Sequence, residues 1–311
     1  MLRIVHKGEF RPHMNVSFRN DELRTRHFIV TAIQYSGGLW DEYSLTATEK
    51  SFAWAAVRIN LKGRVRIEQP GQVVEKDTGA LFLGQGFPSV RLRTAPDEWS
   101  GVDVLTLAVR TLVPGSLGEH ASIDVASAAV LRTANELAAA MRAEKPNQVL
   151  AAHLIEFLRA LRSDGIADFP EDEFVAAMAE PIPNVDKLLA AAYQDSVFPL
   201  TRHPGLVDIA QRIGLGERQT NRRMHEYFQK YHVVDHGWQG YISGTRLMMA
   251  SVLASAPEAS TELVAKLAGF RSPTSLCHAF AEVGWASPSQ VGKALRQGDG
   301  LRAVTKPPSV R

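Results

Sequence analysis

Apolar and polar residues alternate with a period of two through much of residues 52–109, the pattern of β-strands with one buried face. In the clearest run, Val57, Ile59 and Leu61 alternate with charged or amide side chains, and Lys62-Gly63 marks a turn before a second such run. Further short apolar runs are separated by segments rich in Gly, Pro and Asp, which favour turns. Many short strands with frequent turns predict an antiparallel barrel or sandwich, with one face of each strand buried and the other wet.

The period changes to that of a helix in the next segment. Residues 126–162 are rich in Ala and Leu, and their apolar residues recur three or four positions apart. They predict two helices in an antiparallel hairpin, which complete an N-terminal domain over residues 1–165. Residues 166–183 combine acidic residues with three prolines, a composition that stops helices and is typical of a linker.

The pattern is helical throughout residues 184–297, and it contains an internal repeat. Ile209–Leu215 recurs as Val264–Phe270, 55 positions later, with Ala second and Gly sixth in each copy. Each copy reads as a helix that ends on glycine and is followed by a polar helix. The repeat therefore predicts two helix-turn-helix units, at about residues 205–228 and 260–283.

Small residues occupy the positions where two such helices cross and turn. Ala210 and Ala265 allow the second helix to cross close over the first. Gly214 and Gly269 suit the left-handed backbone that ends a helix without a Cβ clash. Ser272-Pro273 supplies an N-cap residue and a proline at the first helical position of the second polar helix.

The two polar helices carry side chains of the types that read bases or bind phosphate. In residues 217–228 these are Arg218, Gln219, Asn221, Arg222 and Arg223. Arg218, Asn221 and Arg222 share one helix face, and we expect the arginines to bond guanine and Asn221 to bond adenine. The corresponding surface of residues 273–283 consists of Thr274, Ser275, Cys277 and His278, with Arg271 near a phosphate. A basic helix face that is merely solvated is the alternative interpretation.

Net charge divides the chain at about residue 200. Residues 1–200 carry 21 Lys+Arg and 25 Asp+Glu, a net −4, whereas residues 201–311 carry 14 and 8, a net +6. This asymmetry indicates that the C-terminal part binds a polyanion, although uneven surface charge without a partner explains it equally well on this observation alone. The last residues, 298–311, are expected to form a flexible tail.

Composition argues against several classes of protein. The 311 residues are 45% apolar and 22% charged, as in soluble globular proteins, and no run of about 18 apolar residues could span a bilayer. The single cysteine, Cys277, allows no intramolecular disulfide, so we expect a cytoplasmic protein that binds no membrane. No histidine lies between Phe52 and Arg110, and no nucleophile elbow or phosphate loop is present. We therefore expect no enzyme activity, no cofactor and no metal site.

The sequence resembles the AraC/XylS family of bacterial transcription regulators over residues 185–297, about a third of the chain. Three segments carry the resemblance: the first recognition helix, the linker helix with its Arg-Leu pair, and the second unit with the Ser-Pro that follows it. These segments are Gly214–Met224, Tyr241–Ala250, and Ala268–Phe280 with Ser287-Pro288. Residues 56–82 are more loosely similar to the cupin-type sensor domain of the XylS-like branch.

The resemblance implies an α+β protein. A cupin-like antiparallel β-barrel over about residues 1–113 and dimerisation helices over about residues 126–162 would precede an all-α domain, in which a linker helix joins two helix-turn-helix units. Gly216 stands where the family usually has Ser or Thr, and Thr220 where a large apolar residue is usual. His278 replaces a usual arginine, so we expect the second unit to bind DNA more weakly.

The implied function is a sequence-specific, ligand-responsive transcription activator at the nucleoid of the bacterial cytoplasm. A homodimer would bind double-stranded promoter DNA, read two successive major grooves and contact RNA polymerase. A small-molecule effector would bind in the barrel, with Trp54 and Phe82 as candidate pocket residues, although aromatic residues at such positions are more often core. Two alternatives stay open: a DNA-binding regulator whose N-terminal half only dimerises and, less favoured, a cupin-type enzyme.

Overall fold

The computed structural model spans the whole chain, which divides into two compact units. The first consists of residues 1–5, 19–35 and 42–182, and the second of residues 6–18, 36–41 and 183–311. The structure describes residues 1–10, 13–36, 41–43, 55–69, 72–85, 91–94, 99–106, 111–112, 122–197, 200–201, 205–231, 233 and 237–297.

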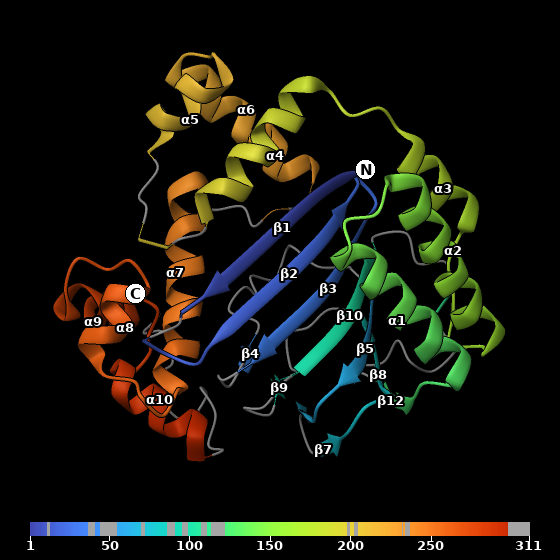
Figure 1. Cartoon of the computed structure of the whole chain (residues 1–311), viewed down its shortest axis with the longest axis horizontal. Coiled ribbons are helices and arrows are strands. Elements are labelled where there is room, and N and C mark those ends of the chain that lie inside the picture. The colour runs from blue at the N-terminus through green and yellow to red at the C-terminus, as the bar shows by residue number, and fades with distance from the viewer. Residues whose placement is uncertain are drawn as a thin grey trace, which may run out of the picture. The chain divides into compact units, whose positions relative to one another are not determined.

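Antiparallel pairing dominates the N-terminal part of the chain (Figure 1). A seven-stranded sheet has the order β1 (Leu2–Glu9), β2 (Ser17–Arg24), β3 (Phe28–Ser36), β10 (Trp99–Thr106), β5 (Ala55–Lys62), β8 (Ala80–Gln85) and β12 (Ser122–Val125). A four-stranded sheet has the order β4 (Asp41–Tyr43), β9 (Arg91–Thr94), β6 (Val65–Gln69) and β7 (Gln72–Lys76), and β11 (Thr111–Leu112) pairs with β13 (Ala167–Asp168). The predicted antiparallel β-region is confirmed. The described strands form open sheets. None of these described sheets closes into the barrel that was expected.

The central strand β5 differs from the expected alternation. Arg58 and Asn60, predicted to face water, are buried together with Val57 and Ile59. β5 is paired on both sides, with β10 and β8, so it has no edge open to water. The Asn60 amide donates hydrogen bonds to the carbonyl oxygens of Gly63 and Asp77, which helps to offset its burial. Tertiary position therefore overrides the period-two pattern here.

Two helices follow the strands as a hairpin, as expected. They are α1 (Ala128–Arg142) and α2 (Asn147–Ser163). The Ser127 hydroxyl caps α1 by accepting a hydrogen bond from the Val130 amide. The two helices contact each other, and α1 also contacts β5. Their buried faces contribute to a core shared with the sheet, including Val130, Leu137, Leu154 and Phe157.

Of residues 166–183, expected to be a linker, those up to Ile182 are folded within the first compact unit. Helix α3 (Glu171–Ala179) lies in this segment, and its Phe174 ring stacks on Phe28 with ring centroids 4.4 Å apart. Pro170 immediately precedes the helix, and three acidic residues occupy the first turn, where the helix dipole favours them. The proline and the acidic run therefore begin a helix.

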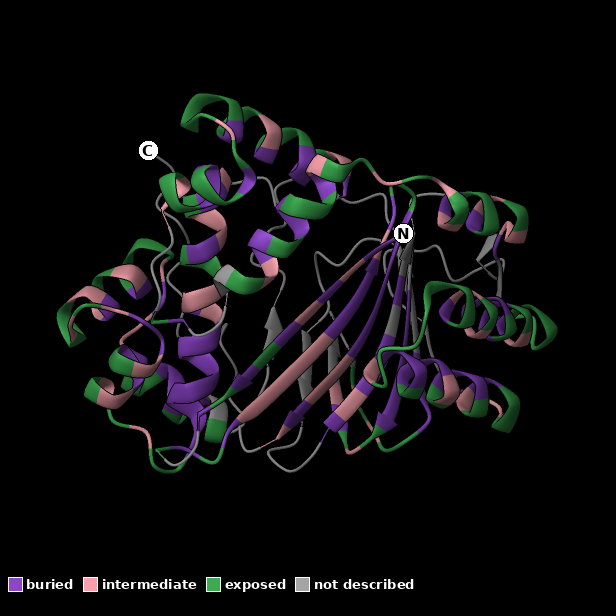
Figure 2. Cartoon of the chain, turned by 45° about the horizontal axis from the view of Figure 1, so that its top comes forward, coloured by how far each residue is buried: buried purple, intermediate pink, exposed green. Residues whose placement is uncertain are grey.

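The second unit is helical over most of its described residues. Its helices are α4 (Asn184–Val197), α5 (Leu206–Ile213), α6 (Glu217–Lys230), α7 (Gly237–Ser255), α8 (Thr261–Leu267), α9 (Pro273–Glu282) and α10 (Pro288–Gln297). The predicted pair of helix-turn-helix units is present as α5–α6 and α8–α9. Helix α7 joins them, and its second half is buried (Figure 2). No helix in the described part of the chain is long and apolar enough to cross a membrane.

Candidate nucleic-acid interface

The first helix-turn-helix is built around two glycines. Gly214 has φ 70° and ψ 29°, the left-handed backbone predicted for it. The Leu215 amide then donates to the Ala210 carbonyl at 3.0 Å, which closes the turn. Gly216 is the N-cap of α6 and supplies no side-chain bond to it. The local sequence thus positions α6 directly after the three residues that follow α5.

The second helix-turn-helix, α8–α9, repeats this geometry with a stronger cap. Gly269 has φ 77°, and the Phe270 amide donates to the Ala265 carbonyl at 2.8 Å. The Ser272 hydroxyl accepts from the Ser275 amide at 3.1 Å, while the Ser275 hydroxyl accepts from the Ser272 amide at 3.0 Å. Ser275, predicted to contact DNA, therefore has its hydroxyl engaged in capping α9.

Helix α6 has one buried face and one exposed polar face. Thr220, Met224, Tyr227 and Phe228 are buried. The predicted base-reading residues Arg218, Gln219, Asn221 and Arg222 are exposed, and Arg223 is half-buried. The structure brings these five side chains together on a surface directly after a helix-turn-helix turn, and here we call that surface the α6 face.

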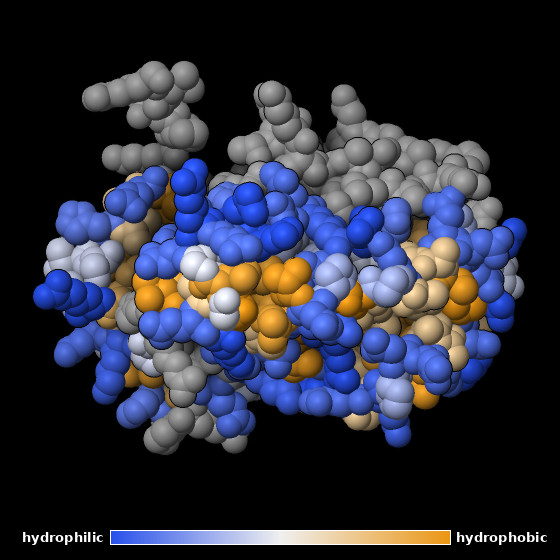
Figure 3. Space-filling model, turned by 90° about the horizontal axis from the view of Figure 1, so that it is seen from above, coloured by the Kyte–Doolittle hydropathy of each residue, from blue (hydrophilic) through white to orange (hydrophobic). Residues whose placement is uncertain are grey.

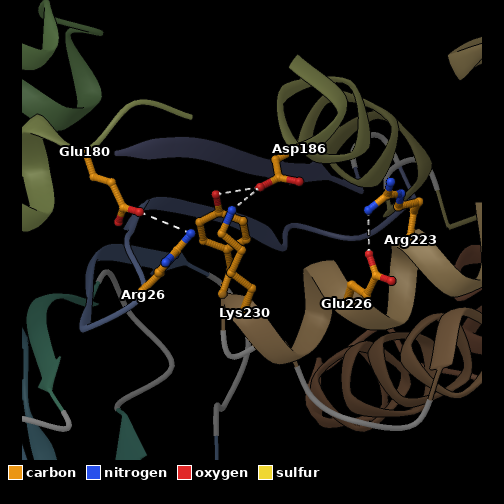
Figure 4. Close-up of polar contacts among 7 residues, drawn as sticks. Arg26, Glu180, Asp186, Arg223, Glu226 and Lys230 are labelled. Atoms are coloured by element: carbon orange, nitrogen blue, oxygen red, sulfur yellow. Dashed lines mark hydrogen bonds and ion pairs between the residues drawn. The ribbon is translucent and has the colours of Figure 1, made fainter. Parts of the chain in front are cut away.

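Two arginines of the α6 face have weak partners within the helix. An Arg223 nitrogen lies 2.8 Å from a Glu226 oxygen (Figure 4). Arg222 Nε lies 3.8 Å from the other Glu226 oxygen. The Arg222 side chain is 66% exposed. Exposed ion pairs of this kind contribute about 0–1 kcal/mol, so a nucleic acid can replace them at little cost.

The surface of α9 is smaller and less charged. Thr274 and His278 are exposed, and Cys277 is half-buried. Arg271 is exposed just before the helix. The opposite face buries Leu276 and Phe280, and the Phe280 ring meets Trp285 edge-to-face with centroids 5.1 Å apart. α9 thus exposes short polar groups where α6 exposes arginines.

Sequence reasoning missed Asp186, a buried residue that anchors α6. Its Oδ2 atom lies 2.5 Å from Lys230 Nζ and accepts a hydrogen bond from the Tyr231 hydroxyl at 2.9 Å (Figure 4). Both partners lie at the C-terminal end of α6, whereas Asp186 lies in the first turn of α4. Nothing in the periodicity singles out one carboxylate 44 positions away, so only the fold reveals the pair.

Aromatic side chains complete the packing of α4, α6 and α7. The Tyr193 hydroxyl donates to the Tyr241 hydroxyl at 2.6 Å, and the ring centroids lie 4.8 Å apart. Phe228 meets both rings at about 6 Å between centroids. Helix α6 is therefore held by a charged anchor at its end and by aromatic contacts along its buried face.

On the face seen in Figure 3, hydrophilic side chains lie on both sides of a band of hydrophobic ones. Large apolar residues that remain exposed in the second unit include Leu188 on α4 and Val207 on α5. In the described part of the chain, none of the large exposed apolar residues belongs to α6. A strongly polar helix with a basic face suits a polyanionic partner better than an apolar one.

Two residues were predicted to line an effector pocket, and the structure describes one of them. Trp54 is outside the described residues. Phe82 lies in β8, opposite Arg58 of β5 and Ile123 of β12. Among the described residues, no group of three His, Cys, Asp or Glu side chains could hold a metal ion.

The chain is similar to solved structures of transcription regulators. ToxT from Vibrio cholerae aligns at 13% identity and a TM-score of 0.33, over 85% of this chain and 97% of that one. The AraC-like transcriptional activator CuxR aligns at 15% identity and a TM-score of 0.33, over 76% and 81%. The DNA-binding domain of AdpA, solved with a target DNA, aligns at 23% identity and a TM-score of 0.31, over 35% and 94%. No protein-family model and no curated protein matches the chain. At these identities and TM-scores, function is inferred from the chain's own geometry.

Proposed function

We propose that this chain is a sequence-specific, DNA-binding transcription regulator of the AraC/XylS type. The observation that supports it most directly is the α6 face, a basic surface presented by a helix-turn-helix whose other side is anchored in a core. A major groove about 12 Å wide admits one α-helix. Arg218, Asn221 and Arg222 lie on the exposed side at i, i+3 and i+4, within reach of base edges when α6 enters the groove.

A second groove would be read by α9. Helix α7 has 19 residues, so it is about 28 Å long at 1.5 Å per residue. Successive major grooves on one face of the duplex lie about 34 Å apart, and α7 with its attached units can span that separation. Because α9 presents Thr274, Cys277 and His278 without an arginine on its surface, it would contribute less base discrimination than α6.

The N-terminal unit would supply dimerisation through α1 and α2 and bind a small-molecule effector. A homodimer would place four recognition helices on a promoter, and effector binding would change how it activates RNA polymerase. The alternative retained from the sequence is a regulator whose N-terminal unit only dimerises. Enzyme activity forms no part of the proposal, and the bacterial cytoplasm, at the nucleoid, is the proposed location.

In vitro selection from a random duplex library, followed by fluorescence anisotropy on the enriched sequences, tests the proposal. We expect two conserved half-sites about one helical turn apart, with the stronger base preference in the half read by α6. An enriched pool without any sequence preference would refute sequence-specific recognition. Mapping of bound DNA across the genome would then identify the promoters and point to the effector.

A further inference from the structure

We propose that the carbonyl group of Leu200 locks the two helix-turn-helix units at one separation, with Arg246 and Gly269 as positioning residues for two-groove recognition. We call these three residues the Leu200 junction. The inference rests on the proposed function for its consequence on DNA, although the junction itself is a property of the free protein. It concerns the spacing between half-sites that the protein accepts.

The Leu200 junction brings together three segments that are far apart in the sequence. Leu200 is buried and lies between α4 and α5, in the part of the chain that leads into the first helix-turn-helix. Gly269 lies in the turn of the second unit, and Arg246 lies in the middle of α7. Arg246 Nε donates a hydrogen bond to the Leu200 carbonyl oxygen at 3.2 Å.

The approach of Gly269 to Leu200 leaves no room for a side chain. A Cβ atom on Gly269 would lie 2.0 Å from the Leu200 oxygen, 2.7 Å from its carbonyl carbon and 3.2 Å from the Thr201 nitrogen. All three are backbone atoms, so a larger residue at position 269 would have to move the second helix-turn-helix away from the segment that precedes the first. The turn of the second helix-turn-helix is therefore in direct backbone contact with the segment before the first.

The repeat provides a built-in comparison for this glycine. Gly214 occupies the equivalent position in the first helix-turn-helix, with φ 70° against 77° for Gly269. A Cβ atom on Gly214 would meet nothing within 4 Å. Glycine at 214 thus serves backbone conformation alone, whereas glycine at 269 serves conformation and contact. A substitution at each position separates the two roles.

Arg246 contributes to the Leu200 junction from a half-buried position on α7. Burial lowers the pKa of its guanidinium from the ordinary value, because the charged form loses hydration. A guanidinium placed there needs acceptors, and the Leu200 carbonyl is one of them. The linker helix is thereby bonded to the same oxygen that Gly269 approaches.

The same arrangement recurs where α10 meets the end of α7. A Cβ atom on Gly292 would lie 2.0 Å from the Ala254 oxygen, and an Arg296 nitrogen donates to that oxygen at 2.9 Å. In Figure 1, α4–α6 lie toward one end of α7 and α8–α10 toward the other. Helix α10 is held at Ala254, and the turn at Gly269 is held at Leu200. The second helix-turn-helix therefore has little freedom to hinge about α7.

A fixed separation has a direct consequence for DNA recognition. One additional base pair between half-sites moves them apart by about 3.4 Å and rotates one by about a tenth of a turn. A protein whose units cannot hinge would lose contacts in one half-site. A protein with a loosened junction would recover part of that loss, so the junction determines which half-site spacing is accepted.

Pulsed electron-paramagnetic-resonance distance measurement on the full chain tests the junction without DNA. Spin labels would be attached at the exposed residues Gln229 on α6 and Glu282 on α9, as Gln229→Cys and Glu282→Cys in a Cys277→Ser background. We call this doubly labelled protein the parent. We expect one narrow distance distribution between the two labels for the parent and for its Gly214→Ala variant. Gly269→Ala should shift or broaden it, and a distribution identical to that of Gly214→Ala would overturn the proposal.

Arg246→Gln keeps the test decisive if Gly269→Ala does not fold, as judged by circular dichroism. It removes the guanidinium from the Leu200 oxygen and adds no Cβ at the contact. We expect a broader distribution than in the parent, and an unchanged one would overturn the role of Arg246 in holding the units.

The DNA experiment uses selected duplexes with the preferred spacing and duplexes with one inserted base pair. We expect the insertion to cost the parent and Gly214→Ala at least tenfold in affinity, and Gly269→Ala less than half that factor. Equal penalties in all three proteins would overturn the spacing role, because a mere loss of stability weakens binding to both duplexes alike. If no protein prefers any sequence, the proposed function fails, whereas the distance measurement still decides on the junction.

Discussion

The proposed base reading by α6 would depend on side chains that can exchange a protein partner for a base. Arg222 meets this condition, because its contact with Glu226 is long and exposed, at 3.8 Å. Arg223 is held more closely to Glu226, at 2.8 Å, and is less exposed, at 43%. The structure therefore ranks Arg222 above Arg223 for direct readout, although their residue types are identical.

Replacement of Arg222 by alanine should separate base reading from phosphate binding. We expect Arg222→Ala to cost about 1–3 kcal/mol on selected DNA and to relax the preference at one base pair. Arg271→Ala should weaken binding to all sequences alike and reduce the salt slope by about 1. Anisotropy titrations at several salt concentrations measure both effects. Equal losses on selected and random DNA for Arg222→Ala would contradict base reading.

The buried anchor at Asp186 should matter more for stability than the exposed pairs. Asp186→Asn removes the charge that faces Lys230 and weakens the acceptor of the Tyr231 hydroxyl. We expect the free energy of unfolding to fall by about 1–3 kcal/mol in urea titrations followed by tryptophan fluorescence. Glu226→Gln is the matched control, with an expected loss below about 0.5 kcal/mol. Equal losses in the two variants would show that Asp186 is no anchor.

At the scale of elements, local signals predicted the helix-turn-helix units well. The glycine at each turn and the Ser-Pro before α9 act through backbone conformation and capping, which neighbouring residues determine. Burial of Arg58 and Asn60 in β5 could not be predicted, because it depends on strands and a helix distant in sequence. The same holds for α3, whose buried Phe174 depends on contact with Phe28.

The contact between α2 and α3 should give the first unit an acid-dependent contribution to stability. A hydrogen bond from Arg159, aided by its charge, lowers the pKa of Glu171 from the ordinary value. A carboxylate with a lowered pKa in the folded state stabilises the fold above the unfolded-state value, and that contribution is lost as pH falls below about 4.5, through the folded-state pKa. In Glu171→Gln the fall in stability on acidification should be smaller, as urea titrations at several pH values would measure.

Glu156→Gln is the control for this prediction. Glu156 also lies near Arg159, at 4.0 Å, but on the same helix α2, so it does not join two elements. We expect its pH dependence to follow that of the unsubstituted chain. An unchanged acid limb in Glu171→Gln would contradict the role of the Arg159–Glu171 contact.

At the scale of the whole molecule, charge and structure divide along similar lines. The net +6 of residues 201–311 includes the arginines of the α6 face, and the net −4 of residues 1–200 includes the acidic start of α3. A basic C-terminal part would bind DNA while an acidic N-terminal part stays off it. The sequence therefore carries a charge signal for a polyanion-binding site, but no comparable signal for an effector, because a small-molecule pocket is defined by shape.

Thermal unfolding in the presence of small molecules should distinguish an effector-binding regulator from one that only dimerises. A ligand at 100 times its dissociation constant stabilises the folded state by about 2.7 kcal/mol. For the first compact unit, of about 160 residues, this raises the melting temperature by about 5–10 °C. The compounds to test are substrates and products of enzymes encoded beside the promoters that the protein binds. A shift with one of them would support an effector site, whereas a dimeric, DNA-binding protein without any shift would favour the dimerisation-only alternative.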